Sequence, residues 1–347
     1  MSERPKLPAK GDFNILFTCA GRRVSLMNSF RRAMAELGLR GNLFATDVTT
    51  SSPAYQLADR GFLVPPTRRV EYMPALLDIA ERNAVSLVIP LTDLDLRPLS
   101  RHADRFRRFG CEVMVGSQDI VMNCRDKRKT HTMIEEAGLA GIVTLTLEEF
   151  RAKPFYPCFI KPIMGSAGFG AAILRSPREL DAHIATFGDI MLLQEYVPGQ
   201  EYTIDVYRTR SGVIRRIVPR QRLVVRSGEV EKALTVKDTQ LIEAAARLST
   251  RLDGLWGVYC CQCRRVPGQP PRFFEINPRF GGGTPLSIAA GANLPLYLLQ
   301  EVLHLPTDDR PVDDFVDNML MLRYEDACFS RVAEPTALAG YDSPIFR

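Results

Sequence analysis

The first third of the chain alternates short strand-like segments with helical ones, and this alternation constrains the fold more than any other feature. Strands are predicted at 14–19, 41–47, 85–90 and 111–115, and helices at 24–37 and 72–83. Strands joined by helices of about a dozen residues form βαβ units and a parallel sheet. The turns 20–23 and 91–95 then share the carboxyl edge of that sheet, where ligands bind.

A different pattern begins after residue 117. A helical segment, 117–138, is followed by a strand at 158–162 that ends in proline, a glycine-rich loop at 164–170 and a strand at 171–174. Strand, loop, strand predicts a hairpin over a ligand and differs from the strand, loop and helix of a Walker P-loop. Further helices are predicted at 177–187, 238–252 and 284–303, and β segments at 190–196, 202–225, 256–263 and 272–277. The chain is therefore α/β at its start and α+β in its C-terminal part.

Composition narrows the class of protein. The 347 residues are 46% hydrophobic and 24% charged, which is ordinary for a globular protein and excludes collagen, coiled coil and wholesale disorder. No apolar run approaches the roughly 18 to 20 residues of a membrane span, and the polar start lacks the apolar segment of a secretory signal. We expect a soluble, cytoplasmic protein with no membrane partner.

Charge and cysteine usage exclude two further classes of function. Only eight of the 45 basic residues are lysines, and the arginines are spread along the chain, so the net charge of +5 forms no nucleic-acid stripe. The cysteines crowd at Cys260, Cys261 and Cys263, which fits reduced core thiols better than a disulfide framework. A zinc site lacks the second half of its ligand spacing.

The segment 273–279, FFEINPR, carries the most chemical information. Alternation along a strand puts Glu275 and Asn277 on one face, with Phe274 and Ile276 in the core. A carboxylate beside an amide oxygen suits Mg2+, and Gln262 would add a third oxygen if the two strands pair. The competing interpretation is the polar face of an amphipathic strand.

Two other segments suggest nucleotide binding: one has features of a phosphate site, and the other has features of an adenine and ribose site. Lys161 ends an apolar strand just before the glycine-rich loop, whose N–H groups could cradle phosphate; the alternative is a solvated lysine. Segment 194–205, QEYVPGQEYTID, leaves a strand and enters another, which exposes backbone groups to an adenine edge, with Glu201 near the ribose.

Taken in order, these motifs resemble the ATP-grasp superfamily, and more closely its short carbamoyl-phosphate-synthase-like proteins. The resemblance runs from Ile15 to about Tyr324 and includes Asp126-Lys127 before a helix, Lys161-Pro162 with the GSAGFG loop, and FEINPRFGGG. It implies an ATP-grasp fold after a Rossmann-like N-terminal domain. The implied domains are 1–117, an ATP-grasp lid region at 118–193 with the glycine-rich loop, and a C-terminal domain with the metal site at 194–347.

The resemblance also implies the role of each site residue. Lys127 and Lys161 would contact ATP phosphates, and Arg279 would stabilise the transferred phosphoryl group, with Lys161 and Arg279 as the catalytic pair. The loop residues over the phosphates would be Gly165, Ser166, Ala167, Gly168 and Gly170. Glu195, Tyr196 and Val197 would bind adenine and Glu201 the ribose. Gln262, Glu275 and Asn277 would hold Mg2+, with Mn2+ as an alternative ion.

The activity that the resemblance implies is phosphoryl transfer from ATP to a small carboxylate, followed by attack of an amine on the acyl phosphate. The chain departs from the family at Cys260, where asparagine is common, and that residue should share the face of Gln262. A homodimer is an open expectation.

Alternatives remain at this point. An ATP-binding regulatory or structural protein without turnover would carry the same motifs. A nicotinamide-dependent oxidoreductase is disfavoured, because the first turn, AGRR, has one glycine where that class has GxGxxG. Arg22, Arg23, Asp93 and Asp95 could be substrate contacts or structural ion pairs, and Arg220 and Arg226 could be anion anchors or solvated side chains.

Overall fold

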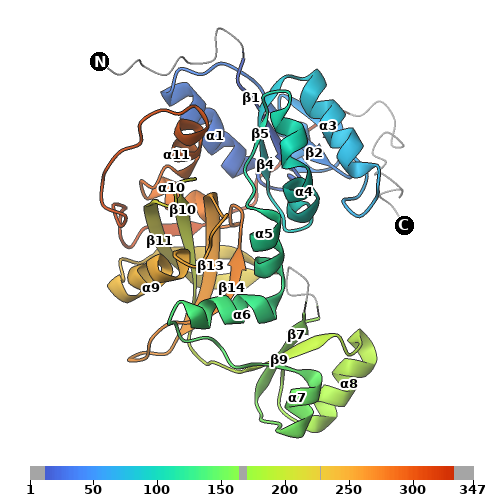
Figure 1. Ribbon diagram of the computed structural model, residues 1–347, viewed down its shortest axis with the longest axis vertical. Helices are drawn as coiled ribbons and strands as arrows, with labels where there is room; N and C mark the ends of the chain where they lie inside the picture. Colours follow the sequence, from blue (N-terminus) through green and yellow to red (C-terminus); the bar gives the residue numbers. More distant parts are fainter. Residues whose placement is uncertain (1–11, 164–169, 227, 332–347) are drawn as a thin grey trace.

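The part of the chain that the structure describes folds into three sheets with helices packed around them (Figure 1). The computed structural model describes residues 12–163, 170–226 and 228–331. No helix in these ranges is long and apolar enough to span a membrane.

The N-terminal sheet is parallel, as the alternation predicts, and has the strand order β3-β2-β1-β4-β5. Its strands are β1 (Asn14–Thr18), β2 (Leu43–Asp47), β3 (Arg60–Leu63), β4 (Val85–Pro90) and β5 (Glu112–Val113). The helices α1 (Val24–Glu36), α2 (Pro53–Leu57), α3 (Tyr72–Arg82) and α4 (Leu96–Arg107) connect them. The elements β3, α2 and α4 were not anticipated from the sequence.

The second sheet is antiparallel and has six strands in the order β14-β13-β10-β11-β12-β15. They are β10 (Gln200–Arg208), β11 (Ile214–Arg226), β12 (Glu229–Thr235), β13 (Gly257–Arg265), β14 (Arg272–Asn277) and β15 (Leu320–Leu322). Helix α9 (Thr239–Ser249) covers one face together with α5 (Gln118–Arg125) and α6 (Lys127–Glu136). These last two helices fall in the segment that the sequence assigns to the lid, yet their core contacts are with the six-stranded sheet.

The third sheet is a small four-stranded unit with the order β6-β9-β7-β8. It contains β6 (Thr144–Thr146), β7 (Cys158–Pro162), β8 (Ala172–Leu174) and β9 (Met191–Glu195), with α7 (Leu147–Ala152) and α8 (Pro177–Phe187). Strands β7 and β8 pair antiparallel, which confirms the hairpin around the glycine-rich loop. Figure 1 shows this unit projecting from the rest, and its buried residues form a cluster of their own, centred on Phe150.

Two helices predicted as continuous are each broken in the structure. Asp126 separates α5 from α6: its backbone is extended, and its side chain caps α6 by accepting a hydrogen bond from the Arg128 N–H at 3.0 Å. The predicted helix 284–303 is α10 (Thr284–Ala289) followed by α11 (Leu294–Val302). Gly291 between them has a φ of 103°, which ends the first helix, and Asn293 caps the second.

The N-terminal sheet and the six-stranded sheet share one hydrophobic core. Phe30 on α1 makes edge-to-face contacts with Phe17 on β1 at 5.2 Å and with Phe280 at 5.5 Å, between ring centroids. The same cluster contains Tyr207 of β10 and Leu298 of α11. These two parts are therefore fixed to each other by packing, whereas the four-stranded unit has a separate core.

Separate cores predict separate responses to mutation. Phe30→Ala should lower the free energy of unfolding by about 3 to 5 kcal/mol and increase amide hydrogen exchange in both large sheets, because it removes a fully buried ring from their shared core. Phe150→Ala, the matched change in the small unit, should increase exchange only within 144–195. Exchange that rises across the whole chain in the second variant would contradict this division.

Candidate functional site

The predicted metal ligands lie together on one face of the six-stranded sheet. Strands β13 and β14 pair antiparallel, with Gln262 opposite Glu275 and Cys260 opposite Asn277. Because residues two apart point to the same side of a strand, these four side chains share a face. The pairing on which the third oxygen ligand depended is confirmed, and so is the position of Cys260 beside Gln262.

A bulge in β14 corrects the prediction for Phe274. The register between β13 and β14 shifts after Gln262, so Cys263 pairs with Phe273. Phe273 is fully buried in the core, and Phe274 is only half-buried on the side of the site. The extra residue of a bulge reverses the alternation on one side of it, which simple alternation cannot anticipate.

Lys161 lies near the Phe274 ring that this bulge turns toward the site. It ends β7 of the four-stranded unit, is 7% exposed, and its ammonium lies 5.4 Å from the centre of the Phe274 ring. It has no hydrogen bond or ion pair to any described residue. Burial lowers the pKa of Lys161 to about 8; the nearby Glu275 opposes this shift and Lys127 adds to it.

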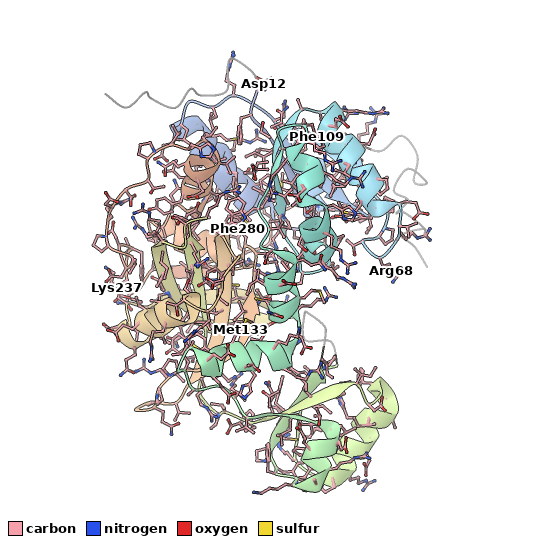
Figure 2. All side chains as sticks on the ribbon, viewed as in Figure 1. Asp12, Arg68, Phe109, Met133, Lys237 and Phe280 are labelled. Atoms are coloured by element: carbon pink, nitrogen blue, oxygen red, sulfur yellow. The ribbon has the colours of Figure 1, made fainter. Side chains whose placement is uncertain are left out.

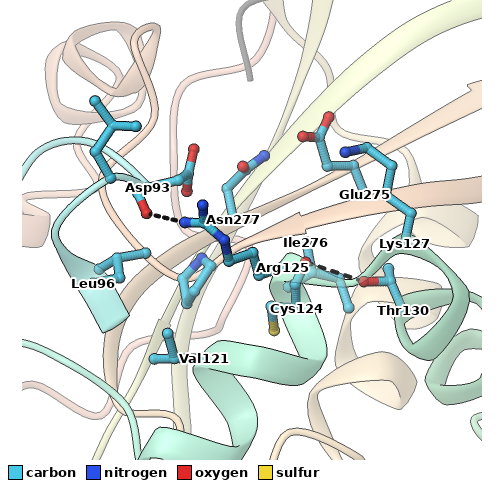
Figure 3. A pocket seen from close by; sticks show the side chains of 12 residues that line it. Asp93, Leu96, Val121, Cys124, Arg125, Lys127, Thr130, Glu275, Ile276 and Asn277 are labelled. Atoms are coloured by element: carbon cyan, nitrogen blue, oxygen red, sulfur yellow. Dashed lines mark hydrogen bonds between the residues drawn. The ribbon is translucent and has the colours of Figure 1, made fainter. Parts of the chain in front are cut away.

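Lys127, at the start of α6, approaches the site from the other side. Its ammonium donates to the Ile163 carbonyl at 3.4 Å, and burial lowers its pKa against the opposing effect of Glu275 and Asp93. Figure 3 shows Lys127 and Glu275 pointing into the same space, with Asn277 beside them. A pocket there is lined by the 93–96 loop, by α5 and the first turn of α6, and by residues 275–278.

Arg279 joins the metal face to the N-terminal domain. Its guanidinium makes two hydrogen bonds to the Asp93 carboxylate, Nε to Oδ1 at 3.0 Å and Nη2 to Oδ2 at 2.6 Å, and donates to Asn277 Oδ1 at 3.3 Å. Burial acts to lower the pKa of Arg279, but Asp93 outweighs it and the net pKa is raised. Arg125 donates to the Asp93 backbone carbonyl at 2.9 Å, which fixes the same loop.

A chain of charged and amide groups crosses the rest of the face. The side-chain amide of Gln262 makes two hydrogen bonds. Its nitrogen donates to Glu275 Oε2 at 2.5 Å, and its oxygen accepts from Arg222 Nη1 at 2.5 Å. Arg222 also pairs with Glu201, Nε to Oε1 at 3.2 Å, and Arg264 pairs with the other Glu201 oxygen at 3.0 Å. The predicted ribose ligand Glu201 is thus linked to the predicted metal ligand Gln262 through Arg222.

The predicted adenine segment lies where β9 leaves the small unit for β10. The Glu195 carboxylate pairs with Arg272 and accepts from the Val143 N–H at 3.0 Å, and the Val197 carbonyl accepts from Arg264 at 3.3 Å. Tyr196 between them is exposed.

The glycine-rich loop falls mostly outside the described residues. Gly165, Ser166, Ala167 and Gly168 are not described. Gly170 has a φ of 66°, and its carbonyl lies 3.1 Å from His183 Nε2 on α8.

The two aspartates of the 91–95 turn have different surroundings. Asp93 faces Arg279, whereas Asp95 is fully buried, accepts hydrogen bonds from Thr18 and from the Tyr72 hydroxyl at 3.2 Å, and has its pKa raised to about 6 by burial. Asp95 therefore holds the turn, and Asp93 is the member that reaches the site.

The two candidate anion anchors, Arg220 and Arg226, also differ in their surroundings. Arg220 makes two hydrogen bonds to Asp205, at 2.9 and 2.8 Å, and both side chains are fully buried, with the Ser287 hydroxyl donating to Asp205 at 2.6 Å. A Cβ on Gly283 would lie 2.0 Å from Arg220 Nη1, so this loop position requires glycine. Arg226 is 75% exposed and pairs with Glu231 at 3.3 Å.

The donor set on the sheet face fits Mg2+ shared with phosphate oxygens. Glu275 is the carboxylate of this set, and Gln262 and Asn277 add amide oxygens that also accept from Arg222 and Arg279. No group of three or more His, Cys, Asp or Glu side chains in the described ranges could hold a metal by itself. Mg2+ is commonly bound by one or two carboxylates together with substrate phosphates and water, which is the set that this face offers.

Sequence reasoning did not single out Arg222, Arg264 or Arg125. The first two lie two residues beyond Arg220 and Gln262 on their strands, so alternation alone places them on the site face. Arg125 directly precedes the predicted Asp126-Lys127 motif.

Family models match two parts of the chain. Residues 187–323 match "ATP-grasp in the biosynthetic pathway with Ter operon", and residues 15–114 match the PylC-like N-terminal domain.

Two curated relatives match about half of the chain. A formate-dependent phosphoribosylglycinamide formyltransferase of Bifidobacterium longum is 26% identical over 205 residues, 49% of this chain and 50% of the relative. A D-alanine–D-alanine ligase of Thermotoga petrophila is 27% identical over 177 residues, 42% and 58% of the two chains. The chain therefore spans only half to three fifths of these relatives.

Among solved structures, the fold is similar to a biotin carboxylase of Campylobacter jejuni in complex with an ATP analogue. The TM-score is 0.70 at 16% identity, over 88% of this chain and 74% of that one.

The buried pair predicts a large difference between two arginine variants. Arg220→Ala should lower the free energy of unfolding by about 3 to 5 kcal/mol, because it leaves Asp205 as an uncompensated buried charge. Arg226→Ala, the control on the same strand, should cost less than about 1 kcal/mol. Urea unfolding of both variants measures the difference, and equal losses would show that the buried pair does not hold this face.

Proposed function

The chain is an ATP-grasp protein, and from that premise we propose that it is an ATP-dependent ligase that activates a small carboxylate as an acyl phosphate and transfers it to an amine. The proposal rests on the site as well as on the family. The curated relatives include a ligase and a formyltransferase, while the chain spans only part of each, so the activity of this chain is inferred from its own residues.

The observation that carries the proposal is the Lys161 ammonium, buried without an ionic partner among the described residues, beside a face with a single carboxylate. An unpaired buried cation is costly unless a ligand supplies the opposite charge. Lys127 adds a second ammonium, and Glu275 acts to raise the pKa of both lysines. A polyphosphate neutralises both lysines and supplies the oxygens that a metal site with one carboxylate lacks.

The chain's own residues have distinct parts in the proposed reaction. Lys161 and Lys127 bind and orient the phosphates, and Arg279, held by Asp93, stabilises charge on the phosphoryl group in transfer. Glu275, Gln262 and Asn277 would hold Mg2+, which when bound neutralises phosphate charge and aligns the reacting oxygens. Glu201 would accept from the ribose hydroxyls and Val197 would offer its backbone to adenine.

The position of Lys161 on the small unit adds a further property. Its strand belongs to the four-stranded unit, whereas Glu275 and Arg279 belong to the large body. Binding of a nucleotide at both places excludes water from the reacting phosphate, which protects an acyl phosphate from hydrolysis.

The lowered pKa of Lys161 predicts a pH-dependent affinity. Because burial lowers the pKa to about 8, the ammonium loses its charge as the pH rises through 8, and the dissociation constant for MgATP should increase there. In Lys161→Ala the affinity should be weaker at every pH and this step should disappear. Calorimetric titration between pH 6.5 and 9.5 tests both, with the exposed Lys153→Ala as control; an unchanged step in the Lys161 variant would reject this assignment.

Turnover tests the reaction itself. With ATP, Mg2+ and pooled carboxylic acids and amino acids, we expect ADP release that depends on the pool, and a loss of about 100-fold or more in Glu275→Gln and Lys161→Ala without unfolding. A parallel series with Mn2+ examines the alternative ion. If ATP binds but no pool releases ADP, the protein is an ATP-binding regulatory protein and the ligase proposal fails.

A further inference from the structure

A second group of charged side chains lies beside the metal face and has no part in the proposed phosphoryl transfer. Arg23 follows the turn after β1, and its guanidinium makes two hydrogen bonds to Glu229 on β12, at 2.9 and 3.3 Å. Arg323, just after β15, approaches Oε2 of the same carboxylate at 3.5 Å. One carboxylate therefore bridges guanidiniums from the N-terminal domain and from the six-stranded sheet.

This ion pair lies directly on the glycine loop that follows Arg279. A Cβ on Gly282 would lie 2.2 Å from Glu229 Oε2 and 2.5 Å from Arg23 Nη1. The absence of a side chain at Gly282 thus lets both charged groups sit against the backbone, three residues from Arg279. Arg279 and Cys260 are near enough to act on the pKa of Arg23, so the ion pair borders the metal face.

Two further cations lie near Arg23. Burial lowers the pKa of Arg23, Glu229 opposes this shift, and Arg279 and Arg323 add to it. Arg23 also directly precedes the 13-residue helix α1, which has no capping side chain and no acidic residue in its first turn. The positive end of the helix dipole therefore adds to the guanidiniums.

The ion pair of Arg23 and Glu229 is partly exposed, so a ligand can reach it. The side chains of Arg23 and Glu229 are 19% and 33% exposed, in contrast to the sealed pair of Arg220 and Asp205. A partly exposed ion pair contributes little net stability, so replacing Glu229 by the anion of a ligand costs little.

We propose that Arg23 and Arg323 bind a second anionic group of the acceptor, whose reacting carboxylate lies at Arg279, and that Glu229 occupies this place until the acceptor binds. The inference rests on the proposed ligase function and narrows its substrate. The acceptor is a small molecule that carries two anionic groups, which we call a dianion for short: either a dicarboxylate or a carboxylate that bears a phosphate group.

Substitutions of Arg23 and of Glu229 distinguish a structural ion pair from a ligand-binding one. If the pair is only structural, Arg23→Ala and Glu229→Gln both break it and act in the same direction. If Glu229 is a stand-in for the ligand, removing Arg23 weakens dianion binding, whereas removing the charge of Glu229 strengthens it.

Direct binding measures this without turnover. The probes are succinate, 2-phosphoglycolate and, as the monoanion, acetate, titrated calorimetrically at constant ionic strength into the full-length protein and its variants. We expect both dianions to bind the wild type more tightly than acetate, about tenfold weaker binding in Arg23→Ala, and tighter binding in Glu229→Gln. Arg22→Ala, an exposed neighbour in the same turn, is the control and should bind as the wild type does. The better of the two dianions distinguishes a carboxylate from a phosphate as the second group.

Two results would overturn the inference: equal binding of succinate, 2-phosphoglycolate and acetate by the wild type, or changes of the same sign in the two ion-pair variants. MgATP binding, measured in the same variants, should stay unchanged, since neither residue faces the phosphates. Failure of the wild type to bind MgATP would reject the proposed function itself, separately from the outcome with the dianions.

Discussion

The arrangement of the site depends on one buried charge. Lys161 carries an ammonium that is almost entirely removed from water, and no described residue pairs with it. Two neighbours on β14 reduce the cost of this charge: Glu275 favours the charged form, and the Phe274 ring lies 5.4 Å from the ammonium. Both join the end of β7 in the small unit to β14 of the large sheet, and in the proposed reaction a ligand anion would supply the remaining opposite charge.

The two kinds of basic residue have different tasks in this structure. Arginines are engaged in ion pairs with two or more hydrogen bonds that fix the frame, as Arg220 does with Asp205 and Arg279 with Asp93. A planar guanidinium suits such pairs, whereas an ammonium is a compact charge that can be offered to a phosphate. The scarcity of lysine in the sequence thus fits the proposed site, in which Lys127 and Lys161 contact the phosphates, whereas Arg220 and Arg279 are held by carboxylates of the protein.

The parts of the fold that follow from local pattern could be predicted. The parallel sheet and the hairpin of β7 and β8 follow from apolar periodicity and chain order, and alternation places Glu275 with Asn277 on one face. The bulge at Phe274 could not be predicted, because it depends on the partner strand. The break at Asp126 was missed because its capping side chain competes with helix continuation inside an apolar pattern.

The long-range part of the site was beyond sequence reasoning. Asp93 and Arg279 are 186 residues apart, and nothing local to either residue indicates the other. The roles proposed for the ligand-binding residues come from the resemblance and from their placement.

The lowered pKa of Lys161 has a chemical consequence that reaches beyond binding. At neutral pH an amine with a pKa of about 8 is neutral in roughly one molecule in ten, and a neutral amine is a nucleophile. An acyl phosphate formed beside it would be an electrophile within reach of the protein's own side chain. In the proposed reaction, phosphate bound at Lys161 would keep the amine protonated, so the nucleotide that makes the reactive intermediate would also protect the protein from acylating itself.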